Sequence, residues 1–181
     1  AGFSSLGFTL AGFVPRCAVE AQPKLAALHK VMHPNVPVIT ADITDDATAA
    51  LIHDACPEPA TIMAGIACQP YSRAGKQDGG QDARAATLPA AMRLTHWLQA
   101  PILVLECVVP ARSNEYVLAH LRELETQLRY HVVDCTLKLE DTWSAMRYRW
   151  WMVATHRRLG RVYIPDYPKG SPLVVRDLMP Y

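Results

Sequence analysis

The residues of this chain best suited to chemistry follow short apolar runs. Cys68 comes after TIMAGIA and Glu106 after ILVL, while Glu20 and Asp42 follow the shorter runs CAV and PVITA. If these runs are parallel strands, their carboxyl ends line one edge of a sheet, where ligands of open α/β sheets bind. A thiolate is a nucleophile, and carboxylates accept hydrogen bonds from ligand hydroxyl and amine groups. The pattern indicates a nucleotide-type cofactor beside a reactive centre.

Cys68 also opens a long polar loop, residues 68–85, which contains three glycines. A loop at a strand end can expose a thiol and lower its pKa, as a nucleophile requires. Taken singly, a cysteine after an apolar run is more often a small buried hydrophobe, and this alternative stays open. His29 and His33 lie one helical turn apart, which is a spacing that suits a metal. Because no third ligand is evident, we expect a packed or solvated pair and no metal site.

The elements that must position these residues alternate between strand and helix. Runs of strand length predict strands over residues 17–20, 37–41, 61–64, 102–106, 131–137 and 149–155. Apolar residues at helical spacing predict helices over residues 21–32, 44–53, 86–99 and 114–128, with Thr44 as a candidate cap. This alternation predicts an α/β fold with a mostly parallel sheet flanked by helices. A glycine-containing turn opens the chain, so we expect that its first strand is missing from this sequence.

The composition excludes several classes of protein. The chain has 181 residues, half of them hydrophobic, which is enough for one domain with a sizeable core. Five widely spread cysteines predict reduced thiols in a cytoplasmic compartment. There is no apolar run of about eighteen residues and no basic segment before an apolar stretch, so we expect neither a membrane span nor a signal peptide. The formal net charge of +1 provides no electrostatic support for nucleic-acid binding.

The run ACQPYSRAGKQDGGQDAR resembles the catalytic loop of DNA (cytosine-5) methyltransferases, in which Pro-Cys-Gln, an aromatic residue and Ser precede a glycine-rich loop. Further motifs recur in the order of that family. LGFTLAGF resembles its first cofactor motif, LECVVPA its Glu-Asn-Val motif, AMRYRWWMVA its Gln-x-Arg-x-Arg motif, and PLVVRDLMPY the segment before its target-recognition domain. The likeness covers nearly the whole chain, and the Cys68 loop is its most specific part.

The resemblance implies a Rossmann-like fold that binds S-adenosylmethionine. Residues 1–160 would form the catalytic domain, without its N-terminal strand, and residues 161–181 a connector toward an absent target-recognition domain. The expected reaction is transfer of a methyl group to carbon 5 of cytosine in double-stranded DNA, in a prokaryotic or phage-encoded restriction-modification system. A second chain carrying the recognition domain is a further expected partner.

The resemblance also assigns the site residues. Cys68 would be the nucleophile that adds to carbon 6 of a flipped-out cytosine, and Glu106 would bind ring nitrogen 3 and the exocyclic amine. Arg149, with Arg147 behind it, would hold the carbonyl oxygen of the base and the loop. The cofactor would contact Gly2, Phe3, Glu20, Asp42, Ile43 and Ala67. The DNA would contact Gln69, Ser72, Arg73, Lys76 and Arg84.

Several positions depart from the family pattern. Ala67 replaces the proline before the nucleophile, Cys107 the asparagine of Glu-Asn-Val and Ala145 the glutamine of the arginine motif; Phe3 or Ser4 stands where a second glycine is usual. Three readings stay open: a fragment of a longer enzyme, the larger part of a split enzyme, or a degenerate homologue that binds cofactor or a partner chain without activity. An RNA cytosine is the alternative substrate.

Overall fold

The computed structural model describes residues 2–72, 78–138 and 147–164. Its helices are α1 (Phe3–Leu10), α2 (Pro23–Met32), α3 (Asp46–Ala55), α4 (Thr87–Trp97) and α5 (Glu115–Thr126). Its strands are β1 (Ala18–Val19), β2 (Val38–Ile39), β3 (Thr61–Gly65), β4 (Ile102–Cys107), β5 (Tyr130–Lys138) and β6 (Tyr148–His156). The strands and helices predicted from periodicity are present, and their ends lie close to the predicted ones. The fold is therefore α/β, as expected.

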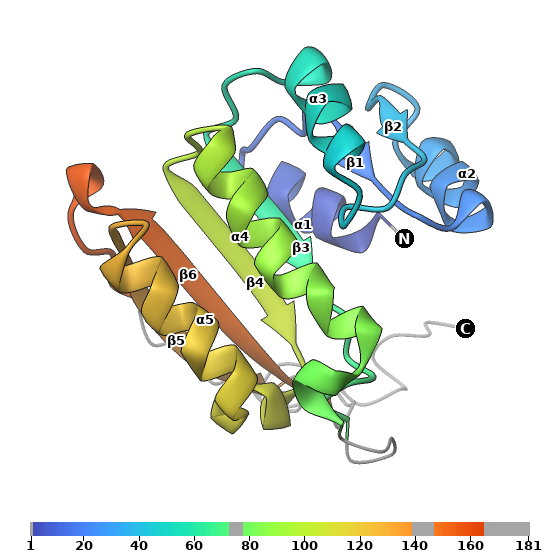
Figure 1. Ribbon diagram of the computed structural model, residues 1–181. Coiled ribbons are helices and arrows are strands. Elements are labelled where there is room, and N and C mark those ends of the chain that lie inside the picture. Colours follow the sequence, from blue (N-terminus) through green and yellow to red (C-terminus); the bar gives the residue numbers. More distant parts are fainter. Residues whose placement is uncertain (1, 73–77, 139–146, 165–181) are drawn as a thin grey trace, which may run out of the picture.

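The expectation of a mostly parallel sheet is wrong. The larger sheet has the strand order β3-β4-β6-β5, in which β3 and β4 are parallel and β6 runs antiparallel to both of its neighbours. A crossover to a parallel strand takes a dozen or more residues, and only residues 139–147 connect β5 to β6. The chain therefore returns in the opposite direction, and β6 enters between β4 and β5 (Figure 1).

The residues predicted to lie along one sheet edge belong to two separate sheets. β1 and β2 form a parallel pair of their own, which carries Glu20 and Asp42 just beyond its strand ends. β3 and β4 belong to the larger sheet, with Glu106 in β4 and Cys68 shortly after β3. Ile43 connects the two parts, because its side chain packs against both hydrophobic cores.

Helices α4 and α5 cover one face of the larger sheet (Figure 1). Alternate residues of β4 are buried on this face, as period-two geometry requires, and the last of them is Cys107. Leu88 and Met92 of α4, with Val117 and Leu124 of α5, belong to the same core. The candidate reactive residues Cys68 and Glu106 therefore lie at the end of a well-packed sheet.

The beginning of α3 differs in detail from the prediction. The N-cap is Asp45, whose carboxylate accepts a hydrogen bond from the Ala47 amide at 3.0 Å. Thr44, the expected cap, instead donates from its hydroxyl to the Asp42 carboxylate at 2.8 Å. An aspartate at the helix start also interacts favourably with the helix dipole.

Within the described ranges, no helix combines the length and the apolar character needed to cross a membrane. The predicted connector over residues 161–181 lies outside the described residues from position 165 onward. The domain division at residue 160 therefore stays a prediction.

Candidate active site

The backbone places Cys68 at the carboxyl end of β3. Parallel pairing with β4 continues beyond the strand, because the Ile66 amide donates to the Glu106 carbonyl at 3.2 Å. The chain then turns sharply, and the amides of Tyr71 and Ser72 both donate to the Cys68 carbonyl, at 3.0 and 2.9 Å. Tyr71 is buried in the core and anchors the turn. The Cys68 side chain is half-buried, so the thiol is held in place without being sealed off.

Glu106 and Arg149 form an ion pair beside this turn. In the sheet, Glu106 of β4 lies opposite Gly65 of β3 on one side and opposite Trp151 of β6 on the other. Arg149 Nε lies 2.8 Å from Glu106 Oε1, and both side chains are largely buried. The Nε–H bond does not point at the carboxylate, so the contact is an ion pair without a hydrogen bond from this atom. The guanidinium also donates through Nη1 to the Tyr148 carbonyl at 2.8 Å. A carboxylate and a guanidinium thus meet at the strand ends near the thiol.

The surroundings of Cys68 favour its thiolate. A side-chain hydrogen bond with Cys107 is the largest influence and lowers the pKa of the Cys68 thiol, to about 6. Burial and the Glu106 carboxylate act in the opposite direction, while the Val108 amide and the Arg149 guanidinium lower the pKa further. The same hydrogen bond, with burial, raises the pKa of Cys107, which therefore stays a thiol. Cys68 has the low-pKa, partly exposed setting of a nucleophilic cysteine.

Two exposed arginines, which were predicted to take part in catalysis and in DNA contact, do not join this cluster. Arg147 is exposed and precedes β6, and among the described residues the ion pair of Glu106 is with Arg149. Arg84 is exposed, and its guanidinium is 2.6 Å from the Asp82 carboxylate, so a phosphate would compete with that pair. Gln69 is exposed and Ser72 is half-buried, next to the nucleophile. The remaining two, Arg73 and Lys76, lie outside the described residues.

Two carboxylates stand at the ends of the small sheet. Asp42 accepts hydrogen bonds from the Thr44 amide and hydroxyl, both at 2.8 Å, and these bonds lower its pKa. Glu20 accepts from the Gln22 amide at 3.0 Å. These tight local turns hold both carboxylates just beyond parallel strands, where the hydroxyl and amine groups of a nucleoside can be bound. The chemistry of the donors and acceptors present therefore fits the adenosine part of S-adenosylmethionine.

The start of α1 is shaped by a glycine. Gly2 has a φ of 82°, and a Cβ there would come within 3.1 Å of the His33 ring. His33 binds the Gly2 carbonyl through Nε2 at 2.8 Å, and His29 Nε2 lies 2.9 Å from the Ser5 hydroxyl. The two histidines thus attach α1 to α2, and their rings pack against each other with centroids 4.9 Å apart. In the part of the chain that the structure describes, no cluster of three or more metal-binding side chains is present.

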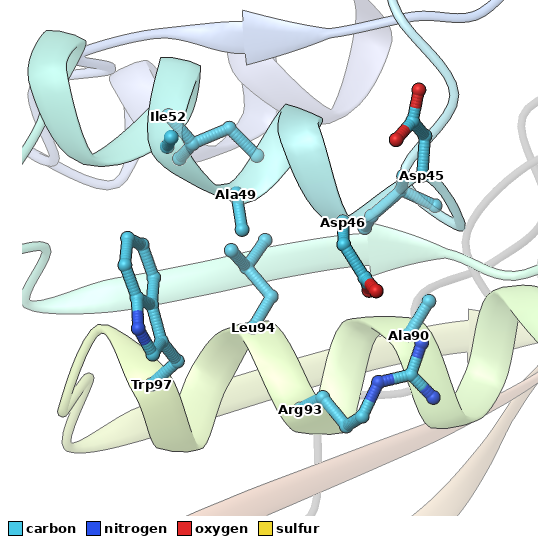
Figure 2. A pocket seen from close by; sticks show the side chains of 10 residues that line it. Asp45, Asp46, Ala49, Ile52, Ala90, Arg93, Leu94 and Trp97 are labelled. Carbon is cyan, nitrogen blue, oxygen red and sulfur yellow. The ribbon is translucent and has the colours of Figure 1, made fainter.

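A groove of about 330 Å³ lies between α3 and α4. Figure 2 shows Asp46 and Arg93 at one end and Ile52, Leu94 and Trp97 at the other. Ile43, predicted to contact the cofactor, also lines the groove, but neither Cys68 nor Glu106 does. The groove is therefore separate from the reactive cluster.

Sequence reasoning missed the contacts that hold the nucleophile loop. The hydroxyl of Thr87 accepts from the Ala67 amide at 3.2 Å, and Cys107 Sγ lies 4.0 Å from the Ala67 carbonyl. The alternation of β4 predicts that position 107 is buried, but no pattern in the chain links it to residues forty positions earlier.

The α/β fold of this chain matches that of solved methyltransferase structures. A DNMT2 mutant from Spodoptera frugiperda superposes with a TM-score of 0.76 over 98% of this chain and 56% of its own, at 15% identity. A putative DNA modification methyltransferase encoded within an E. coli prophage superposes with a TM-score of 0.75 over 96% of this chain and 50% of its own, at 22% identity. At these identities, the likeness establishes the fold alone.

Sequence comparison assigns the family. The family model of the C-5 cytosine-specific DNA methylases matches residues 1–178, and the chain belongs to this family. It is also similar to the type II methyltransferase M.AquIA of Picosynechococcus sp., with 32% identity over 111 residues, which is 60% of this chain and 45% of that protein. The chain thus spans about half the length of these relatives.

Proposed function

We propose that this protein transfers a methyl group from S-adenosylmethionine to carbon 5 of cytosine in DNA, through a covalent adduct on Cys68. The observation that carries the proposal is the convergence of Cys68, Glu106 and Arg149 at one end of three neighbouring strands. A nucleophile held as a thiolate, a carboxylate and a guanidinium are the groups needed to activate a cytosine ring. Family membership supports the same reaction class.

The proposed chemistry follows from these groups. The Cys68 thiolate adds to carbon 6, a sulfur–carbon bond forms, and the ring's double-bond electrons shift toward carbon 5. Glu106, as a carboxylic acid, donates to ring nitrogen 3 and accepts from the exocyclic amine, and Arg149 donates to the carbonyl oxygen. Both groups thereby offset the negative charge that develops on the ring as the thiolate adds. S-adenosylmethionine supplies an electrophilic methyl group to carbon 5. Transfer of the carbon 5 proton to a water molecule then expels the Cys68 thiolate and restores the double bond between carbons 5 and 6.

The residues around this centre have proposed binding roles. Glu20 would hold the ribose hydroxyls and Asp42, with Ile43, the adenine; Gly2, Phe3 and Ala67 would contact the rest of the cofactor. The target base has to leave the duplex, which costs a few kcal/mol of unstacking. Contacts from the Cys68 loop would offset that cost; the residues proposed for them are Gln69, Ser72, Arg73, Lys76 and Arg84.

The wider setting is also proposed. The similarity to a type II methyltransferase and to a prophage-encoded enzyme supports a prokaryotic or phage restriction-modification system acting in the cytoplasm. Residues 1–160 would be the catalytic domain and 161–181 the connector. The recognition of double-stranded DNA would depend on a target-recognition domain, supplied by the rest of the protein or by a second chain.

Covalent trapping tests the proposal. The intact protein, with any recognition subunit encoded beside it, is incubated with S-adenosylmethionine and duplex DNA that contains 5-fluorocytosine, whose fluorine cannot leave as the proton does. A protein–DNA adduct that survives denaturation is expected from the unchanged protein and from Cys135→Ser, a matched thiol control, and not from Cys68→Ser.

Each contrary result has a clear meaning. An undiminished adduct with Cys68→Ser would refute the nucleophile assignment. An adduct on RNA containing 5-fluorocytosine, but not on DNA, would refute the substrate. Absence of any adduct from a folded protein that also fails to bind S-adenosylhomocysteine in calorimetry would refute the activity, and would favour a non-catalytic homologue.

A further inference from the structure

One threonine connects the two ends of the polar loop that begins with Cys68. Thr87 is the first residue of α4, and its hydroxyl donates to the Arg84 carbonyl at 2.9 Å and accepts from the Ala67 amide at 3.2 Å. Arg84 lies at the end of the loop, and Ala67 directly precedes the nucleophile. The side chain of Thr87 therefore joins the backbone on the two sides of residues 68–85.

The other backbone bonds next to Cys68 do not depend on any side chain. The Ile66 amide donates to the Glu106 carbonyl at 3.2 Å, and the Cys68 carbonyl accepts two amides of its own turn, at 3.0 and 2.9 Å. The Ala67 amide lies between these groups and donates instead to a side-chain hydroxyl. A single substitution can remove this acceptor, so the position of the backbone before the nucleophile depends on which residue stands at 87.

The residue types at positions 67 and 87 match each other. Proline, which the resembled methyltransferase motif has before its cysteine, has no amide N–H and a φ fixed at about −65°. Ala67 has a free φ and an amide that needs an acceptor. A hydroxyl has one donor and two acceptor sites, so Thr87 can bind this amide while its own proton is directed at the Arg84 carbonyl. The hydrogen bond thus restrains the segment that a proline ring would otherwise restrain.

Both partners of this hydrogen bond are partly shielded from water. Ala67 and Thr87 are half-buried, and their neighbours Ile66 and Leu88 belong to the main core. Water can therefore replace the hydroxyl only incompletely, and a shielded amide without an acceptor is unfavourable. Removal of the hydroxyl should loosen the backbone before Cys68.

We propose that Thr87 is a positioning residue for the nucleophile: its hydroxyl binds the Ala67 amide and so holds the backbone that carries the Cys68 thiol against the start of α4. Thr87 does not touch the substrate base in this scheme and acts only through Ala67 and Cys68. The catalytic consequence rests on the proposed function, since it matters only if Cys68 attacks cytosine. The restraint on the backbone, by contrast, can be measured without methyl transfer.

Amide hydrogen exchange in the intact protein, followed residue by residue by NMR, tests the restraint. Thr87→Val removes the hydroxyl and keeps the branched shape, so the Ala67 amide should exchange about tenfold faster. The Val104 amide, in the middle of β4, should exchange as before, because the sheet keeps its own pairing. Thr87→Ser keeps the donor and the acceptor and should retain slow exchange at Ala67.

A matched threonine controls for the loss of a hydroxyl. Thr126→Val, in α5, removes a hydroxyl that binds the Arg122 carbonyl, and it should leave exchange at Ala67 unchanged. Circular dichroism confirms that each variant is folded. If Thr87→Val is not folded, Thr87→Ala takes its place.

Adduct formation tests the consequence for Cys68. With saturating duplex DNA that contains 5-fluorocytosine, Thr87→Val should slow the covalent adduct about tenfold. The DNA concentration that gives half the maximal rate should change by less than about twofold, because Thr87 does not contact DNA in this scheme. Ala67→Pro removes the amide that Thr87 binds, so in that background Thr87→Val should slow the adduct by less than about twofold.

Three results would overturn the inference. One is unchanged exchange of the Ala67 amide in the folded Thr87→Val protein. Another is an equal rise in Thr87→Ser and Thr87→Val, which would assign the effect to packing. The third is equal slowing of the adduct by Thr87→Val with and without Ala67→Pro, since Thr87 would then act by another route. If the exchange rates respond as expected but no variant forms an adduct, the proposed function fails and the restraint by Thr87 stands.

Discussion

The carboxylate of Asp134 is expected to stabilise the strand that carries Arg149. Asp134 Oδ2 accepts the indole N–H of Trp150 at 2.7 Å and also receives Arg112 Nε at 2.7 Å. Trp150 is 0% exposed, so its N–H depends on the Asp134 carboxylate for an acceptor. Arg112, by contrast, is 54% exposed at the side chain. One carboxylate thus serves a buried donor and an exposed one.

The two contacts differ in expected magnitude. Leaving a buried N–H without an acceptor costs about 1–3 kcal/mol, whereas an exposed ion pair contributes roughly 0–1 kcal/mol. Asp134→Ala should therefore lower the free energy of unfolding by about 2 kcal/mol. Arg112→Ala should lower it by less than about 1 kcal/mol. Asp134→Asn keeps an oxygen that can accept from the indole, so its cost should be close to that of Arg112→Ala.

Urea denaturation followed by tryptophan fluorescence measures these differences. With a slope of about 2 kcal/mol per M, Asp134→Ala should lower the midpoint by about 1 M. In a thermal scan, the same loss corresponds to a Tm about 4–8 °C lower for a domain of this size. Equal losses in Asp134→Ala and Arg112→Ala would refute the reasoning, because the exposed ion pair and not the buried indole would then be the important contact. A midpoint unchanged by Asp134→Ala would refute it as well.

Two further predictions concern the loop and the N-terminal helices. Gly80→Ala should lower the urea midpoint, at a cost of about 1–3 kcal/mol, because a Cβ at this position would overlap the Tyr116 ring; an unchanged midpoint would contradict that contact. Burial, followed by the charges of His33 and the N-terminus, lowers the pKa of His29 from its ordinary 6.5. As the pH falls, the His29 imidazole therefore binds a proton in the unfolded chain at a higher pH than in the folded one. The contribution of neutral His29 to the free energy of unfolding is present above pH 6.5 and is lost as the pH falls below it. His29→Gln should reduce the drop in Tm between pH 7.5 and pH 5, and an equal drop in both proteins would show that His29 is not responsible.

Much of the local structure was predictable from the sequence. Helix α4 and strand β4 follow directly from apolar spacing, because each buries one face against the core. The small sheet was harder to delimit, since β1 and β2 contain two residues each and their pairing is set by partners distant in the chain. Thr44 and Asp45 are both acceptable caps by residue type, and only the path of the turn after Asp42 selects Asp45.

The identities of the candidate site residues could be predicted from the sequence, but their relative positions in space could not. The order of motifs around Cys68, Glu106 and Arg149 in the sequence indicates one class of chemistry. Arg147 shows the limit of that reasoning: it matches the same motif as Arg149, yet it precedes β6 and is exposed. Alternation along a strand would place residues 147 and 149 on the same face, but β6 begins only at Tyr148, so strand pairing does not hold Arg147 beside Glu106.

The sequence by itself determined the α/β class, the approximate elements and the family, because periodicity and motif order are written along the chain. Tertiary structure alone decided that β6 enters between β4 and β5, which brings Arg149 within 2.8 Å of Glu106. It also decided that the Cys107 thiol lies 4.0 Å from the carbonyl of Ala67, which directly precedes the nucleophile and is forty residues earlier in the chain. Contacts of this kind arise from the pairing of distant strands and from the packing that fixes their register, and neither is encoded in the spacing of neighbouring residues.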